Sequence, residues 1–503
     1  MDRHPPQRRP SYGTRLVLAA LLCAPCPSHV VLAEATATTT PAGPATPAAD
    51  SPTDAYTEFR HAFDAGQYAS AVPSAQRVLQ LAEQQAQEPT AEEVQVALMN
   101  LAFTQYLAGD YVAAETSFVR AIKLVQDSGR PLHQRLARAY AGLASTYHDG
   151  QRHDLAVANF DQAIALTRRH EGLLTEQQVP LLRKYVDSLT ELGRYDAALQ
   201  AQRYLLRIAT RKHGENSVEL VPTLEQLGNW YARVGGYEQA RRTLREAVAL
   251  VERAEGAKSP KLIGPLVAIA ACNRRQLLDP TQQPAVMPDA QRATIFAEPG
   301  VPDPGSYAYS PTVLLAEGEK ALMRAAAIAE ERTDASPVEV ADVRTQLGDW
   351  FQGRDQPERA LPHYRLAWQA AAGATARIEG KPLVEALFGR PVLLQITRPE
   401  AWDRYAERPR QDIEVRTVSI DLTVDAQGRP QGGKVIDDSG DAKRAARTLD
   451  AIRTARYRPR FQQGEPVATP GVVYAQPWLV LVEPSEDEAP PAAAGPAAQQ
   501  PGG

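Results

Sequence analysis

Cysteine is scarce in this sequence of 503 residues, which contains only three. Cys23 and Cys26 lie within the first 35 residues, so Cys272 is the one cysteine in the remainder of the chain. A single thiol cannot form an internal disulfide, and disulfide stapling is therefore excluded as a source of stability there. A strong charge of one sign is also missing, since the net charge is −5 and the pI is near 6.1. This balance argues against a nucleic-acid partner.

Long apolar runs are missing too. The longest N-terminal run, Leu16–Ala24, has nine residues, whereas a membrane-spanning helix needs about 20. Basic residues precede the run, and small residues that suit a signal peptidase follow it at Ala33 and Ala35. Residues 1–35 are therefore predicted to be a secretory signal peptide, and the protein is expected in the periplasm of a Gram-negative cell. The alternative is a leader that is retained as a membrane anchor.

Catalytic and metal-binding motifs are absent as well. The sequence has no HExxH zinc motif, no GxSxG nucleophile elbow and no GxGxxG dinucleotide motif. The pairs His148-Asp149 and Asp437-Asp438 each supply two ligands, whereas zinc and calcium sites use four or more. We therefore predict a protein that is not an enzyme, with no cofactor, no metal ion and no small-molecule substrate.

The chain is instead rich in a helical pattern, which is clearest between Leu224 and Ala247. Leu227, Gly228 and Tyr231 share one helical face, and Gly235 and Tyr237 follow as a turn. A second helical face then carries alanine and leucine. This order predicts an antiparallel helical hairpin, in which the small side chains allow the two helices to approach closely.

The hairpin pattern recurs at a regular spacing. The small residue that opens each second helix is Ala71, Ala114, Ala156, Ala198 and Ala240, at intervals of 43, 42, 42 and 42 residues. The pattern resembles the tetratricopeptide repeat family, in the long-helix form found in kinesin light chains, because the usual period is about 34. The resemblance implies an α-α superhelix of about seven hairpins over residues 54–372. Proline-rich residues 279–311 are expected to interrupt the sixth hairpin as an insertion.

A superhelix of this kind has a concave wall lined by the first helix of each hairpin. The resemblance places a mixed set of apolar, polar and charged side chains on this wall, which suits an extended peptide. The predicted groove residues are Asn100, Phe103, Tyr106, Ser145, His148, Arg183, Lys184, Asp187, Gln226 and Asn229.

The helical period ends after the array. Residues 373–412 read as a connector, and residues 413–483 as a small α+β domain. Alternating apolar residues predict a strand at 418–424, with a bulge near Arg416–Thr417. A turn, a returning strand at 434–437, a helix at 442–456 and a last strand at 472–482 follow. Residues 36–53 and 484–503 are rich in Pro and Ala and are predicted to be a disordered linker and tail.

The order of these elements, with Asp425-Ala-Gln-Gly428, Tyr457-Arg-Pro-Arg-Phe461 and Gly464-Glu-Pro-Val467, resembles the C-terminal domain of the TonB family. The resemblance implies that a partner segment pairs as an extra strand beside the last strand. Pro477 is expected to interrupt that pairing, and the basic residues from Lys443 to Arg460 are expected to form a solvated face. The receiving edge carried over by resemblance is Val472, Tyr474, Gln476, Trp478 and Val480.

These features together predict a non-enzymatic periplasmic adaptor. Its partners would be proteins or extended peptides, including an outer-membrane protein, and it would contact a membrane only through a partner or a retained leader. The alternative is a TonB-type energy transducer to outer-membrane transporters with an uncleaved N-terminal anchor.

Overall fold

A computed structural model describes residues 52–88, 92–129, 134–278, 310–332, 334–399, 402–403 and 412–482. The predicted signal peptide, almost all of the linker, the body of the insertion and the tail lie outside these residues. No helix within the described ranges is long and apolar enough to cross a membrane. The chain divides into two compact units, with the division between Leu227 and Gly228.

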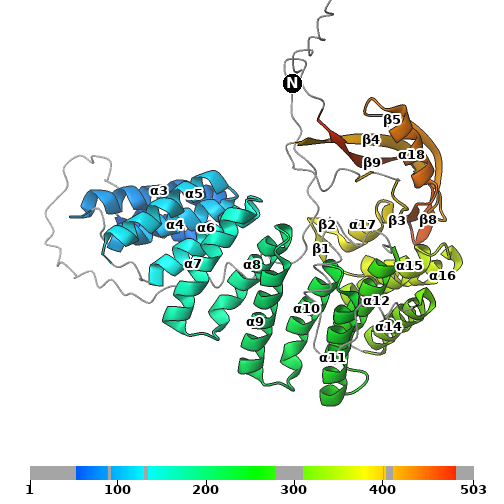
Figure 1. Ribbon diagram of the computed structural model, residues 1–503, viewed down its shortest axis with the longest axis horizontal. Coiled ribbons are helices and arrows are strands. Elements are labelled where there is room, and N and C mark those ends of the chain that lie inside the picture. The colour runs from blue at the N-terminus through cyan, green and yellow to red at the C-terminus, as the bar shows by residue number, and fades with distance from the viewer. Residues whose placement is uncertain are drawn as a thin grey trace, which may run out of the picture. The chain divides into compact units, whose positions relative to one another are not determined.

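The first unit consists of helical hairpins that follow one another along the chain (Figure 1). Short 3-10 turns, η1 (Glu176–Gln178) and η2 (Val218–Leu220), precede two of the helices. The helices are α2 (Pro52–Asp64), α3 (Tyr68–Gln85), α4 (Glu92–Ala108), α5 (Tyr111–Asp127), α6 (Gln134–Asp149), α7 (His153–Glu171), α8 (Val179–Glu191), α9 (Tyr195–His213) and the start of α10 (Val221–Arg233).

The turn inside each hairpin is built around one residue with a left-handed backbone. That residue is glycine in most repeats, as at Gly193, where φ is +69°. The next residue then donates its N–H back to the preceding helix, as from Arg194 to the Leu189 carbonyl at 2.8 Å, which is a Schellman-type helix end. In the third repeat Gln151 takes the same conformation at φ +62° without glycine. The repeat geometry therefore persists where the glycine is missing.

Close helix contact depends on the small residues. Ala71, Ala114, Ala156 and Ala198 are each 0% exposed. A Cβ added at Gly142 would lie 2.3 Å from the buried ring of Phe118, so a larger residue fits there only if this ring moves. The predicted hairpins, with small residues at their contacts, are confirmed.

The second unit begins with the rest of α10 and continues the hairpins. α11 (Tyr237–Glu255), η3 (Pro260–Leu262) and α12 (Ile263–Leu278) are followed by α14 (Pro311–Glu331), α15 (Pro337–Gln352) and α16 (Pro357–Ala372). Asn273 on α12 donates to the Leu314 carbonyl on α14 at 3.2 Å, so these two helices form the interrupted hairpin. At Gly348 on α15 an added Cβ would meet the Tyr364 ring at 2.4 Å.

Strands and two short helices complete this unit. The connector forms β1 (Arg377–Ile378), β2 (Lys381–Pro382), α17 (Leu383–Phe388) and β3 (Val392–Gln395). The C-terminal part forms β4 (Ile413–Val424), β5 (Pro430–Asp437), α18 (Ala442–Ile452), β6 (Arg456–Arg458), β7 (Arg460–Gln462), β8 (Glu465–Val467) and β9 (Thr469–Leu481). All pairings are antiparallel, with a sheet in the order β5-β4-β9 and separate pairs β1-β2, β3-β6 and β7-β8.

One face of the three-stranded sheet carries the core of this part. Val418, Ile420 and Leu422 of β4 and Trp478 of β9 pack there with Ala445 and Ile452 of α18. The helix α18 lies against this sheet (Figure 1). The predicted bulge at Arg416–Thr417 is wrong, because β4 and β9 pair without a shift from Ile413 to Leu422. Val415 is simply on the opposite, open face, where its side chain is 59% exposed. The predicted helix also ends early, since β6 pairs with β3 from Arg456 on.

Candidate functional site

Three helices of the first unit, each the first of its hairpin, contribute side chains to one polar cluster. Tyr106 lies in the last turn of α4, Asp149 is the last residue of α6, and Lys184 lies in the first half of α8. The Tyr106 hydroxyl donates to Asp149 Oδ2 at 2.6 Å, and Lys184 Nζ donates to Tyr106 Oη at 2.8 Å and to Asp149 Oδ2 at 3.0 Å. The cluster therefore links three successive repeats through charge-assisted hydrogen bonds.

A histidine pair extends the polar cluster. His148 Nδ1 lies 2.8 Å from Ser188 Oγ, and His153 Nδ1 lies 3.4 Å from the same oxygen. Burial lowers the pKa of His148 to about 4, and the positive charge of Lys184 acts in the same direction. The imidazole of His148 is therefore neutral at pH 7 and serves as a fixed hydrogen-bonding group.

The predicted groove residues divide into two classes. Tyr106, His148, Lys184 and the nearby Asp187 are brought together, and the negative charge of Asp187 acts on the pKa of His148. Phe103 and Ser145 instead lie inside the hairpins, where Phe103 packs edge to face on Phe118 and Ser145 is 0% exposed. These two side chains are enclosed and offer no surface to a ligand.

The remaining groove residues are partly or fully exposed. Asn100, Arg183 and Gln226 are half-buried in the first unit, and Asn229 is exposed in the second. Within the described atoms, Arg183 Nε is buried without a hydrogen-bond partner. Burial raises the pKa of Glu225, which precedes Gln226, to about 7.

Asp149 and Ser188 belong to the cluster but were not predicted. Their positions in the sequence could have indicated them, because Asp149 directly follows the predicted groove residue His148 and Ser188 directly follows the predicted groove residue Asp187. In the described part of the chain, no group of three or more His, Cys, Asp or Glu side chains is arranged to hold a metal ion. The arrangement consists of fixed hydrogen-bond donors and acceptors, which suit the polar backbone of a bound peptide.

A second polar site, in the second unit, joins the last hairpin to the C-terminal part. Arg458 Nε and Nη2 donate to the two oxygens of Asp349 at 3.0 and 3.1 Å, and Nη1 donates to the Leu387 carbonyl at 2.8 Å. The Tyr364 hydroxyl donates to Asp349 Oδ1 at 2.9 Å. Both charged side chains are 10% exposed. The predicted solvated face is therefore wrong for Arg458, which is a buried docking residue.

Aromatic packing surrounds this ion pair. The rings of Tyr364, Phe388 and Phe461 meet edge to face, with centroids 5.1 to 6.1 Å apart. Arg456 pairs with Asp355 at 2.9 Å. The segment Tyr457–Phe461 thus packs on α15 and α16 through one buried ion pair and a cluster of aromatic rings.

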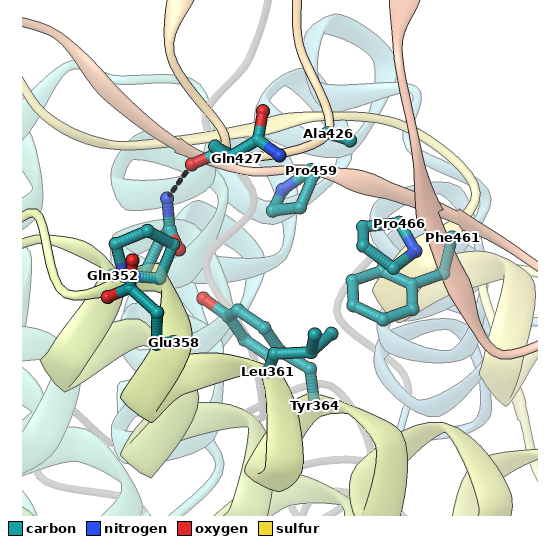
Figure 2. Close-up of a pocket in the computed structure, with 10 residues that line it drawn as sticks. Gln352, Glu358, Leu361, Tyr364, Ala426, Gln427, Pro459, Phe461 and Pro466 are labelled. Atoms are coloured by element: carbon teal, nitrogen blue, oxygen red, sulfur yellow. Dashed lines mark hydrogen bonds between the residues drawn. The ribbon is translucent and has the colours of Figure 1, made fainter.

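A shallow pocket of about 180 Å³ lies beside the seated segment (Figure 2). Leu361 and Tyr364 come from α16, whereas Pro459, Phe461 and Pro466 come from the C-terminal part. Gln352 Nε2 donates to the Gln427 carbonyl at 2.7 Å across one side. Sites for drug-sized ligands usually measure about 300 to 1,000 Å³. This pocket is large enough only for one or two side chains.

The last strand, β9, lies at an edge of its sheet. The five residues predicted for the receiving edge have their side chains on the core face, where Trp478 Nε1 donates to Thr448 Oγ1 at 3.2 Å. Gln476 and Trp478 are each 3% exposed.

The direction of the backbone groups follows from two hydrogen bonds. The Val482 N–H donates to Asp412 on the β4 side, whereas the Leu479 N–H donates to the Trp402 carbonyl at 3.0 Å. Because N–H directions alternate along a strand, the outer edge belongs to odd-numbered residues such as Val473, Ala475 and Pro477.

Comparison with known proteins supports the repeat assignment. Residues 93–169 and 179–276 match the tetratricopeptide repeat family model. No curated protein matches the chain. The chain contains tetratricopeptide repeats, in agreement with its hairpins.

Solved structures of repeat proteins are also similar. The TPR-like repeats of a putative kinesin light chain from Podosopora anserina are 14% identical, with 41% of this chain and 99% of that chain covered and a TM-score of 0.37. The apo quorum sensor NprR from B. thuringiensis is 15% identical, with 64% and 89% covered and a TM-score of 0.33.

Proposed function

We propose that this tetratricopeptide-repeat protein is a non-enzymatic adaptor of the periplasm. The observation that carries the proposal is that one chain has two different surfaces whose chemistry suits protein binding. One is the polar wall of the repeats around Lys184, and the other is the outer edge of β9. An adaptor needs both surfaces, because it holds one partner while it engages another.

The repeat wall is proposed to bind an extended segment of a protein. Tyr106, Asp149 and Lys184 are held by one another, so they are already in position before a ligand arrives. Preorganised polar groups bind with a smaller loss of conformational entropy. Lys184 is neutralised by Asp149, and this favours the uncharged backbone of a peptide over a phosphate group.

The C-terminal domain is proposed to be TonB-like and to dock on a partner by strand addition. The supporting features are the order of its elements, the edge position of β9 and the helix on one face of the sheet. The proposed periplasmic location has its support in the basic residues, apolar run and cleavage site of residues 1–35. An outer-membrane protein is the partner class that fits this location.

A pull-down from periplasmic extract tests the wall proposal. Asn100→Trp would place a bulky side chain at a predicted position of the repeat wall, whereas Val112→Trp places the same side chain on α5, where Val112 is 78% exposed. The proposal expects at least one captured protein to be lost with Asn100→Trp and kept with Val112→Trp. Identical capture by both variants and the native chain would count against the wall as a binding site.

A further inference from the structure

The outer edge of β9 lacks free donors at two positions of its C-terminal half, Pro477 and Leu479. Pro477 has no N–H, and its odd-numbered position places that missing donor on the outer edge. The Pro477 carbonyl accepts a hydrogen bond from Gln476 Nε2 at 2.7 Å. The Leu479 N–H is already bonded to the Trp402 carbonyl. An incoming strand therefore finds no free donor at either position.

A bulge limits the edge at its other end. The pairing of β9 with β4 shifts between Leu422 and Val424, opposite the stretch from Thr469 to Val472. Gly471 lies in that stretch with φ +69°, a left-handed conformation that breaks the strand alternation. The regular outer edge is thus reduced to Val473 and Ala475, each with one N–H and one carbonyl.

The opposite edge of the sheet does not offer a regular alternative. β5 has two shifts of register against β4, and Gly432 within it has φ +64°. Lys434 and Asp437 are exposed on the same strand. Bulges and charged residues are the usual means by which an edge strand is protected from pairing.

The side chains around Val473 and Ala475 define the chemistry of the partner. On the open face Val473 is 58% exposed and Ala475 is exposed beside it. On the core face Val472 and Tyr474 are half-buried and border the apolar core. A strand that pairs here would place alternate side chains beside these apolar groups, so it should carry β-branched or other apolar residues.

We infer that the C-terminal sheet accepts a short, uncharged, extended segment of a partner protein, whose backbone pairs only with Val473 and Ala475, and that Pro477 limits the length of this pairing. The inference rests on the proposed strand addition and deepens it, because it defines which residues pair and what kind of segment they accept.

Amide hydrogen exchange of the intact chain, followed by NMR with ¹⁵N-labelled valine and alanine, tests the inference. The probe is a capped hexapeptide of alternating valine and threonine, N-methylated at every second residue so that it has a single pairing edge. The control is the same peptide N-methylated at every residue. The probe is expected to slow exchange at Val473 and Ala475 at least about tenfold, and the control to leave both unchanged. No slowing by the probe, or slowing on β5 instead, would overturn the inference.

Two proline variants sharpen the test. Pro477→Ala restores one outer donor and should increase the affinity for the probe by about 2- to 12-fold, the range expected for one added hydrogen bond. Ala475→Pro removes an outer donor that β4 does not use, and probe binding should fall at least about tenfold. Unchanged affinity in Pro477→Ala would overturn the inference, whether or not Ala475→Pro folds. If the probe does not pair with Val473 and Ala475 while the C-terminal domain still captures a partner, the inference is wrong and the adaptor proposal stands.

Discussion

The buried pair between Arg458 and Asp349 provides the strongest test of how the C-terminal domain is attached. Arg458→Met would leave the Asp349 carboxylate 10% exposed, with Tyr364 as its remaining donor in this contact. Removal of one partner from a buried ion pair typically costs about 3–5 kcal/mol, because the other charge stays desolvated. We expect a loss of that size in the free energy of unfolding.

Arg453→Met is the matched control for this substitution. Arg453 pairs with Asp450 at 2.9 Å, but the two side chains are 79% and 72% exposed. Exposed pairs contribute about 0–1 kcal/mol. The same chemical change should therefore have a small effect at this position.

Urea unfolding of the intact chain, with hydrogen exchange resolved over residues 413–482, measures both effects. The double variant Asp349→Leu with Arg458→Met should recover most of the loss, because no unpaired buried charge remains. A loss of unfolding free energy in Arg458→Met no larger than that in Arg453→Met would show that burial of the ion pair adds nothing to its contribution. Faster exchange confined to residues 413–482 would show that the domain undocks before the repeats unfold.

Three further predictions follow from the pKa values and the leader. Because the pKa of His148 is lowered to about 4, unfolding takes up a proton below the unfolded pKa near 6.5, and the free energy of unfolding should fall by about 1 kcal/mol between pH 7 and 5.5. His148→Gln should remove this pH dependence of the unfolding free energy, measured by urea titration at several pH values. An unchanged pH dependence in this variant would contradict the prediction. The pKa of Glu225 is raised to about 7, so its contribution to the stability of the fold is present below pH 4.5 and is lost as the pH rises to 7. Glu225→Gln should therefore raise the melting temperature at pH 8 and leave it unchanged at pH 4. Equal changes of the melting temperature at both pH values would count against burial as the cause. Mass spectrometry of the mature chain should find its first residue at Glu34 or Thr36, and retention of residues 1–35 would favour the membrane-anchored transducer instead.

Regular features of the fold were accessible from sequence because they repeat. The buried alanines from Ala71 to Ala240 keep their spacing, and that spacing predicts the hairpins directly. The groove was predicted less well. Phe103 and Ser145 occupy the helix positions that the family pattern assigns to the wall, but the neighbouring helices enclose them. Position on a helix does not report how far the next hairpin covers it.

Long-range contacts were the features that the sequence did not reveal. Arg458 lies in a basic stretch that resembles an exposed face, and its partner Asp349 is 109 residues earlier. No local pattern connects these two residues. The outer edge of β9 was assigned to the wrong set of backbone groups for the same kind of reason. The side-chain alternation is visible in sequence, whereas the side that pairs with β4 depends on the fold.

If the chain is an adaptor, two of its surfaces must each bind a protein. Site-specific photo-crosslinking in intact cells tests this, with the crosslinker at Asn100, a predicted position of the repeat wall, at Val473 on the edge of β9, and at Val112 as the control position. We expect protein adducts at Asn100 and at Val473, different from each other, and none at Val112. Absence of adducts at both test positions, or the same adducts at all three, would show that the chain does not join two proteins through these surfaces.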